Sequence, residues 1–177
     1  MKGRRMELSM SGSAAIKAKG TAGDAWGTPQ DLFTEIKEKY FHSAPFDPCP
    51  NYERLLQGAS YFPKDFNGDG LKMEWGAPEI FVNPPFSKIE PWVKKAHDVS
   101  FSDRRIILLL PARTDQFWFN YYAPTAKIVL IRGRVNYIDI NSNKKSCASF
   151  GSMLMIFGNG VGIDFWWPDC HRNRRKA

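Results

Sequence analysis

The sequence predicts an α/β fold of three layers, in which helices cover both faces of a mostly parallel sheet. Residues 105–111 (RIILLLP) form a continuous apolar run, which is typical of a strand buried on both faces. Strand-like and helix-like patterns alternate along the second half of the chain, as they do when helices connect the strands of a sheet. The chain has 177 residues, of which 43% are hydrophobic, and this is enough to fill one core.

The predicted elements begin after Trp26. Thr28 and Pro29 predict the start of a helix, with Thr28 as its N-cap and Pro29 at its first position. Apolar residues then follow at helical spacing as far as Tyr40. Strands are predicted at 79–83, 105–111, 127–131 and 152–157, further helices at 91–99 and 115–122, and a polar connection at 141–146.

The net charge of +7 is concentrated at the two ends of the chain. Residues 1–20 carry +4 and residues 168–177 carry +3, whereas the charges between them balance. We therefore expect a mobile basic arm over 1–24, one domain over 25–167 and a basic tail over 168–177. Basic arms on a neutral body are typical of proteins that hold a phosphate backbone, although basic ends that only keep a protein solvated are an equally good interpretation.

Composition excludes several classes of protein. There is no apolar run of the roughly 20 residues that a membrane span needs, and the charged first residues are not followed by the apolar segment of a signal peptide. Three cysteines at wide spacing, with no CxxC, argue against a disulfide framework and against a zinc site. We expect a protein of the reducing cytoplasm that has no metal site.

The most informative motif is Asn83-Pro84-Pro85-Phe86. It directly follows a predicted buried strand, so it should lie at the carboxyl edge of the sheet, where open α/β sheets bind ligands. The Asn83 side-chain oxygen and the Pro84 carbonyl could accept hydrogen bonds from a planar amino group, such as that of adenine, and so make its nitrogen more nucleophilic. Proline donates no backbone N–H, and Phe86 could stack on the base. A strand that simply ends at Pro-Pro beside a packed phenylalanine is the structural alternative, since short motifs often match by chance.

Other blocks accompany this motif in a fixed order along the chain. They are residues 26–33 (WGTPQDLF), 46–49 (FDPC), 109–115 (LLPARTD), 131–135 (IRGRV) and 150–154 (FGSML). Together they resemble the phage-type DNA N6-adenine methyltransferase (Dam) family over about residues 26–158. The resemblance implies S-adenosylmethionine-dependent methyl transfer to the N6 amino group of a flipped-out adenine in duplex DNA. It also implies a Rossmann-like methyltransferase fold with a mostly parallel central sheet of about seven strands.

The resemblance assigns roles to particular residues. Asn83, Pro84, Pro85 and Phe86 match the catalytic loop. The cofactor-binding residues that we predict are Trp26, Thr28, Pro29, Asp47, Pro48, Cys49 and Asn83. Among these, Thr28 and Pro29 match the block against the methionine end of the cofactor, and Asp47 matches its acidic residue. The block around Asp47 lacks the glycines usual in methyltransferases, and Asp65 and Asp69 are further candidates for cofactor or base contacts, or else turn residues.

DNA contacts are predicted from basic residues near the same edge. Arg113, Arg132 and Arg134 follow predicted central strands, and phosphate contacts are as good an interpretation as surface ion pairs. Lys144 and Lys145 lie in residues 135–150, the segment best placed to touch DNA. The chain has no evident groove-reading motif, so we expect a short or relaxed target sequence. Trp166 and Trp167 are expected to cover one end of the core.

Two alternatives to the predicted function stay open. Similar loops also serve enzymes that methylate RNA bases, cytosine N4 or a protein glutamine amide, because each of these substrates presents a planar amino group. The second alternative is a non-catalytic nucleic-acid-binding protein on the same fold. From the family alone we expect a role in protecting phage DNA from nucleases in the host bacterial cytoplasm.

Overall fold

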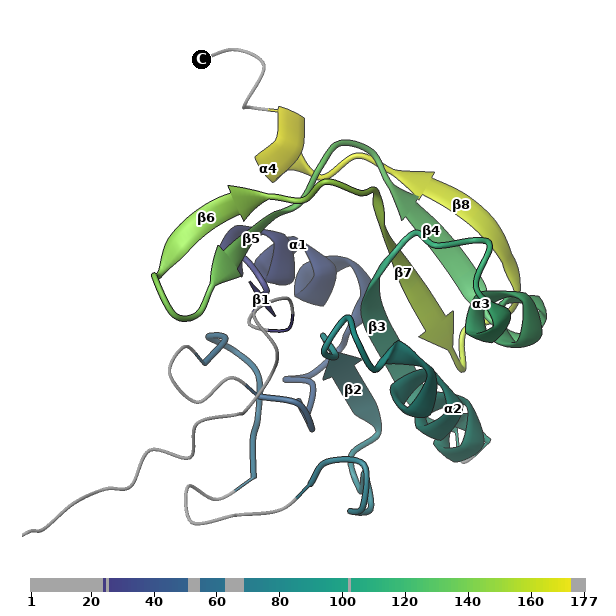
Figure 1. Ribbon diagram of the computed structural model, residues 1–177. Helices are drawn as coiled ribbons and strands as arrows, with labels where there is room; N and C mark the ends of the chain where they lie inside the picture. The colour runs from purple at the N-terminus through teal and green to yellow at the C-terminus, as the bar shows by residue number, and fades with distance from the viewer. Residues whose placement is uncertain (1–23, 25, 51–54, 63–68, 102, 173–177) are drawn as a thin grey trace, which may run out of the picture.

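The structure is a computed structural model that describes residues 24, 26–50, 55–62, 69–101 and 103–172 (Figure 1). Most of its elements lie where the sequence predicts them. In chain order they are β1 (Trp26–Gly27), α1 (Gln30–Tyr40), β2 (Glu79–Val82), α2 (Ile89–Ser100), β3 (Arg105–Pro111), α3 (Phe117–Tyr122), the 3-10 helix η1 (Ala123–Thr125), β4 (Lys127–Ile131), β5 (Asn136–Asp139), β6 (Lys144–Cys147), β7 (Ser152–Phe157), β8 (Gly162–Trp166) and α4 (Asp169–Arg172).

The strands form two sheets. The larger sheet has five strands in the order β2-β3-β7-β4-β8, and the smaller has three in the order β1-β5-β6. In the larger sheet β2 pairs parallel with β3, and β4 pairs parallel with β8. Between these pairs lies β7, which is antiparallel to both of its neighbours. The smaller sheet is entirely antiparallel.

This arrangement shows that the predicted Rossmann-like fold, with its mostly parallel sheet of about seven strands, is wrong. Four of the six strand pairings in the described part of the chain are antiparallel, and the strands divide between two sheets. The apolar run at 152–157 is fully buried because β7 is central, but such a run indicates burial on two faces and carries no information on strand direction. Residues 141–146 are also not a mere connection, because β6 pairs with β5 in a hairpin that projects from the body (Figure 1).

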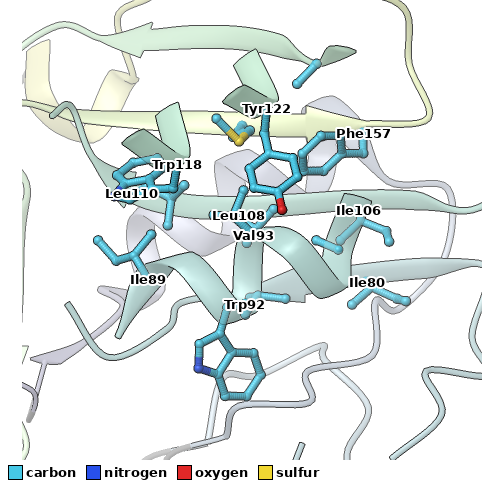
Figure 2. Packing of buried hydrophobic residues seen from close by; sticks show 14 of the residues in the cluster. Ile80, Ile89, Trp92, Val93, Ile106, Leu108, Leu110, Trp118, Tyr122 and Phe157 are labelled. Carbon is cyan, nitrogen blue, oxygen red and sulfur yellow. The ribbon is translucent and has the colours of Figure 1, made fainter. Parts of the chain in front are cut away.

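The core has two halves, one on each face of the larger sheet. Alternate residues of β3 point to opposite faces, so Ile106 and Leu108 pack under α2 and α3 (Figure 2), whereas Ile107 and Leu109 pack against α1. In Figure 1, α2 and α3 accordingly lie in front of the sheet and α1 lies behind it. Both faces of the central strands are therefore covered.

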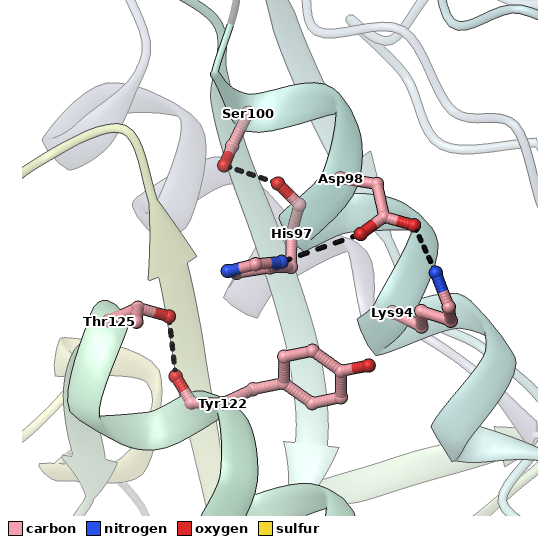
Figure 3. Close-up of polar contacts among 6 residues, drawn as sticks. All are labelled: Lys94, His97, Asp98, Ser100, Tyr122 and Thr125. Carbon is pink, nitrogen blue, oxygen red and sulfur yellow. Dashed lines mark hydrogen bonds and ion pairs between the residues drawn. The ribbon is translucent and has the colours of Figure 1, made fainter.

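His97 of α2 joins α2 to α3. Its ring lies 5.2 Å from that of Tyr122 and 5.7 Å from that of Phe157. Asp98 lies 3.5 Å from Nδ1 of His97 and also accepts a hydrogen bond from Lys94 (Figure 3). These contacts hold both helices on one face of the larger sheet.

Two ends of the predicted domain differ from expectation. The helix α1 begins one residue later than predicted, with Pro29 at the N-cap and no hydrogen bond from a capping side chain, so Thr28 is not the cap. Residues 169–172 of the predicted tail form α4, where the backbone N–H groups of Asp169 and Cys170 each donate to Glu35 at 2.7 Å. Residues 173–177 of the tail and residues 1–23 of the arm lie outside the described residues. No helix within the described ranges has the length and apolar character needed to cross a membrane.

Candidate active site

The Asn83 loop and the segments that follow β3 and β4 meet at one edge of the larger sheet. β2, β3 and β4 all end at this edge, and β7 begins there, because Ser152 lies opposite both Pro111 and Ile131. The segments that follow these strands therefore meet, as the hydrogen bond of 2.8 Å from the Ala112 N–H to the Gly151 carbonyl illustrates. The sequence predicted this meeting of the Asn83 loop with the segments after β3 and β4.

Asn83 presents an acceptor that has no partner among the described residues. Its Nδ2 donates to the Trp26 carbonyl at 2.9 Å, and this bond fixes which way the side-chain amide points. Its Oδ1 is buried, and no described residue donates a hydrogen bond to it. Leaving a buried acceptor unpaired costs on the order of 1–3 kcal/mol. Such an atom is well suited to receive an N–H group from a ligand.

The other end of the loop is held by Asp24. One carboxylate oxygen accepts the Ser87 N–H at 2.9 Å, and the other accepts the Ser87 hydroxyl at 2.6 Å. The segment that precedes α1 thus binds residues 83–87 at both ends, through the Trp26 carbonyl and the Asp24 carboxylate. Sequence reasoning did not identify Asp24, because no local pattern marks a contact across 63 positions.

A cavity of about 370 Å³ opens beside the loop. Four of its nine lining residues are aromatic, namely Trp26, Phe86, Tyr137 and Phe150, and the others are Arg113 and the segment 146–149. Phe86 is only 8% exposed because its ring makes edge contacts with Tyr137 at 5.3 Å and with Phe150 at 5.5 Å. A volume of this size, with aromatic walls on one part and polar groups on another, is within the range of small-molecule pockets.

Tyr137 supports the cavity from inside the core. Its hydroxyl lies 3.1 Å from Oγ of Ser152, and burial raises the pKa of Tyr137 above its usual value, so the phenol stays neutral. Sequence reasoning had not selected Tyr137, Phe150 or residues 146–149 as site residues. The block at 150–154 was the available signal, since Phe150 begins it.

Asp47 lies at the end of a short extended segment beside β2. Phe46 forms parallel bridges with both Ile80 and Ser60, so Asp47 follows it toward the same edge as Asn83. The Asp47 side chain is 5% exposed, accepts the Cys49 N–H at 2.8 Å and makes no ion pair with a described residue. Burial raises its pKa to about 7. Near neutral pH this carboxyl group is therefore poised between its neutral and its charged form.

The remaining residues of the predicted cofactor set are mostly buried. Thr28 and Pro29 are buried where β1 leads into α1, and Pro48 is buried next to Asp47. A Cβ on Gly70 would lie 2.0 Å from the Pro48 carbonyl oxygen, so only glycine fits where these backbones approach. Burial raises the pKa of the Cys49 thiol well above its usual value, which makes it a poor nucleophile.

Of the two further aspartate candidates, only Asp69 lies in the described part of the chain. The side chain of Asp69 accepts the Leu71 N–H at 2.9 Å and lies 3.9 Å from the Lys72 ammonium, as a turn residue does. Asp65 lies outside the described residues. Over the described ranges no group of three or more potential metal ligands is present.

The predicted DNA-binding residues are exposed but do not form one cluster. Arg113 lines the cavity, with its guanidinium 6.0 Å from the Phe150 ring centre, and Arg134 donates to the Ala148 carbonyl at 3.2 Å. Both therefore border the cavity. Lys144 and Lys145 belong to β6, where the Lys145 ammonium lies 3.8 Å from Asp31.

Arg132 lies apart from the cavity, on Trp167. Its guanidinium is 4.1 Å from the ring centre, and that of Arg172 lies 5.4 Å from the same ring. Trp166 instead packs on the core and makes an edge contact with Tyr40. The two neighbouring tryptophans thus differ, because only Trp166 covers the core as expected.

Comparison with known proteins identifies the family. The family model described as DNA N-6-adenine-methyltransferase (Dam) matches residues 15–161. A curated relative, the DNA N-6-adenine-methyltransferase of Escherichia phage T1, is 27% identical over 144 residues. That alignment covers 80% of this chain and 58% of the relative, so the chain spans less than two thirds of the relative's length. No solved structure matches. With most of its length matched by the family model, this chain belongs to the DNA N-6-adenine-methyltransferase (Dam) family.

Proposed function

We propose that this protein transfers a methyl group from S-adenosylmethionine to the N6 amino group of adenine in DNA. The observation that carries the proposal is the Oδ1 of Asn83, which is buried and has no hydrogen-bond partner among the described residues. The Trp26 carbonyl holds this side chain on a loop whose Phe86 lines the cavity. Membership of the Dam family supports the same reaction.

The loop would act by accepting hydrogen bonds. Asn83 Oδ1 and the Pro84 carbonyl would each accept one hydrogen of the adenine amino group, which draws its lone pair out of conjugation with the ring. The amino nitrogen then becomes the nucleophile, and it releases one proton after it has gained the methyl group. This accounts for a loop that contains no titratable side chain between Asn83 and Phe86.

The aromatic cavity would hold the target base. An adenine inside a duplex cannot reach a recessed loop, so the base would be flipped out of the helix and enter beside Phe86, Tyr137 and Phe150. Aromatic and apolar walls suit the face of a purine, and the neutral Tyr137 adds no charge to the site.

The residues around Asp47 fit the cofactor. When bound, S-adenosylmethionine would supply an electrophilic methyl group. A buried carboxyl group without an ion-pair partner among the described residues is suited to a ligand that brings its own ammonium or hydroxyl donors. Asp47 would bind such donors, and Trp26, Thr28, Pro29, Pro48 and Cys49 would shape the surrounding surface.

Duplex DNA would contact the basic residues at the same edge. Arg113 and Arg134 border the cavity, and Lys144 and Lys145 extend from it along β6, so all four could bind phosphates on either side of a flipped base. Arg132 would contact phosphate only beyond this group, from its position on Trp167. None of the three cysteines, all within the described residues, forms a disulfide, which agrees with a reducing cytoplasm.

The proposal is tested by incubating the protein with S-adenosylmethionine and unmethylated duplex DNA, then quantifying methylated nucleosides by mass spectrometry. We expect N6-methyladenine, and we expect Asn83→Ala to form it at least about 100-fold more slowly. Asn159→Ala is the matched control, because Asn159 is exposed in the loop against Arg104 at the opposite edge of the sheet. It should keep full activity.

The outcomes separate the alternatives. Methylation of RNA alone would keep the chemistry and change the substrate, and N4-methylcytosine would change the target base. No product, together with no rise in melting temperature on adding S-adenosylmethionine, would identify a nucleic-acid-binding protein and overturn the proposal.

A further inference from the structure

The strand β8 forms an open edge of the larger sheet. It pairs with β4 on one side, where the Gly162 N–H donates to the Ala126 carbonyl at 3.3 Å and the Trp166 carbonyl accepts the Arg132 N–H at 2.7 Å. In a parallel pair these bonds come from alternate residues, so 162, 164 and 166 direct their backbone groups to β4. Residues 161, 163 and 165 direct theirs outward, where no described strand pairs with them.

The same outward residues carry large exposed apolar side chains. Val161 is 69% exposed, Ile163 is 71% exposed and Phe165 is 76% exposed. Ile163 and Phe165 lie beside Ile128 and Leu130 in the register, and therefore on the face of the sheet that α2 and α3 cover. Proteins usually protect open strand edges with charges, proline or bulges. This edge instead presents an apolar row beside unpaired backbone groups.

We propose that a second copy of this protein binds at this edge and that the two β8 strands pair antiparallel about a two-fold axis. The two larger sheets would then form one continuous sheet. Centring the axis on Ile163 sets Ile163 opposite Ile163 of the second copy, and Val161 opposite Phe165. These are the residues whose backbone groups point outward, so each facing pair can exchange hydrogen bonds.

Charge disfavours one of the two neighbouring registers, because moving the axis to Asp164 would set Asp164 directly opposite Asp164 of the second copy, and like charges facing each other are destabilising. Moving the axis to Gly162 would instead set Phe165 opposite the polar Asn159 in place of Val161. With the axis on Ile163, Asp164 faces Gly162, which has no side chain, and it keeps its contact of 3.5 Å with Lys127 of its own chain. The strand is therefore complementary to itself in one register and not in the next.

The buried area indicates a weak dimer. The three outward side chains would bury at most on the order of 400 Å² per copy, given roughly 150–250 Å² for an aromatic side chain and somewhat less for each aliphatic one. A standard interface buries about 800 Å² per partner, so this contact is about half the standard size. Phe117 and Tyr121, 69% and 62% exposed, belong to α3, which lies on the same face of the sheet, and could add to the contact. We therefore expect weak association, with a dissociation constant on the order of 100 μM.

The oligomeric state tests this proposal. We expect sedimentation equilibrium of the full chain to show a monomer–dimer equilibrium, and Ile163→Lys to raise the dissociation constant at least tenfold. Phe101→Lys is the matched control, because Phe101 is equally exposed but follows α2, and it should leave the constant unchanged. A monomer at all concentrations up to about 1 mM, or a dimer that Ile163→Lys does not weaken, would overturn the proposal.

Cross-linking tests the register itself. Facing residues in a hydrogen-bonded antiparallel pair have Cα atoms about 5.5 Å apart, which a disulfide can span. Under mild oxidation Ile163→Cys should cross-link the two copies more readily than either the unsubstituted protein or Asp164→Cys. Equal cross-linking of the two variants would rule out the axis at Ile163. Because the cavity lies beside β2 and β3, methyl transfer by Ile163→Lys should persist, so failure of this proposal is distinguishable from failure of the proposed function.

Discussion

The two ends of β2 use buried polar groups in opposite ways. At the amino end, the Glu79 carboxylate accepts the N–H groups of His42 and Ser43 at 2.9 and 2.7 Å and the Ser43 hydroxyl at 2.6 Å. At the carboxyl end, Asn83 Oδ1 receives no hydrogen bond from a described residue, and the nearby Asp47 accepts one. Both ends are buried, but the polar groups are satisfied at only one of them.

The pKa values follow the same division. Burial acts to raise the pKa of Glu79, but hydrogen bonds from Ser43 and His42 outweigh it and hold that pKa below its usual value. At Asp47 burial outweighs the single hydrogen bond from Cys49 and raises the pKa to about 7. A carboxylate that accepts several hydrogen bonds within the protein stabilises the fold, whereas one that accepts a single bond can still bind a ligand. The comparison therefore predicts that substitutions at the two ends will damage different properties.

The largest effect is expected for Asn83→Ala on catalysis. Removing one preorganised hydrogen-bonding group from an active site typically lowers turnover about 10²- to 10³-fold. Stability should change by less than about 1 kcal/mol, because the lost bond to the Trp26 carbonyl is offset by removal of an unpaired buried acceptor. Steady-state kinetics and urea unfolding of the same preparation measure both. A large loss of stability without a loss of turnover would show that Asn83 has a structural role, as Glu79 does, and would contradict the prediction.

Glu79→Ala should show the reverse pattern. It leaves the donors of His42 and Ser43 without their acceptor and removes the partner that lies 3.7 Å from Arg105. We expect the free energy of unfolding to fall by roughly 2–4 kcal/mol. Turnover of the folded enzyme should be unaffected. Glu38→Ala, on the exposed face of α1, is the control and should change stability by less than about 0.5 kcal/mol.

The two carboxyl groups should also respond to pH with opposite signs. Because Asp47 binds its proton more tightly when folded, its contribution favours folding at low pH and is lost as pH rises from about 4 to about 7. Asp47→Asn removes this loss, so its stability relative to the wild type should increase over that window, by at most roughly 4 kcal/mol. Glu79 contributes stability above its unfolded pKa, and that contribution falls as pH drops through its lowered folded pKa. Urea unfolding at a series of pH values would test both signs, and parallel curves for wild type and Asp47→Asn would refute the first.

The sequence predicted the catalytic loop and several elements of the fold, but not the contacts that make the two ends of β2 differ. Asn83 was found because its motif follows a strand whose apolar pattern is plain, α1 was found by its helical periodicity, and β3 was found by its continuous apolar run. The direction of β7 was missed because Ser152–Phe157 is buried on both faces whichever way the strand runs. The strands β6 and β8 lack a buried face, so no alternation marks them as strands of a core. The Asp24–Ser87 contact depends on the folded loop and leaves no local pattern.

Asp24 provides a smaller test of the loop. Asp24 is a positioning residue, because it holds the loop that carries Asn83 and does not line the cavity. It should therefore affect turnover and not the binding of DNA. Asp24→Ala should lower kcat about tenfold with KM for DNA unchanged, since both Ser87 contacts are lost. Asp24→Asn keeps an acceptor for the Ser87 N–H and should restore most of the activity. A merely structural role would lower thermal stability instead, with kcat per folded enzyme intact.

The smallest effect is expected at Arg113. If its guanidinium meets a phosphate beside the cavity, Arg113→Ala should reduce the slope of log K against log salt for DNA binding by about 0.9. Arg104→Ala, at the amino end of β3 on the opposite edge, should leave the slope unchanged. If both variants gave equal slopes, Arg113 would not contact a DNA phosphate.

The most direct test of the central claim follows the methyl group itself. The protein would be supplied with S-adenosylmethionine carrying a deuterated methyl group and with unmethylated duplex DNA, and the DNA nucleosides would be resolved by mass spectrometry. The account predicts equal amounts of deuterated N6-methyladenine with the wild type and with Asn159→Ala, and initial rates at least about 100-fold lower with Asn83→Ala. Label in another base, equal rates for all three proteins, or no label in DNA at all would contradict it.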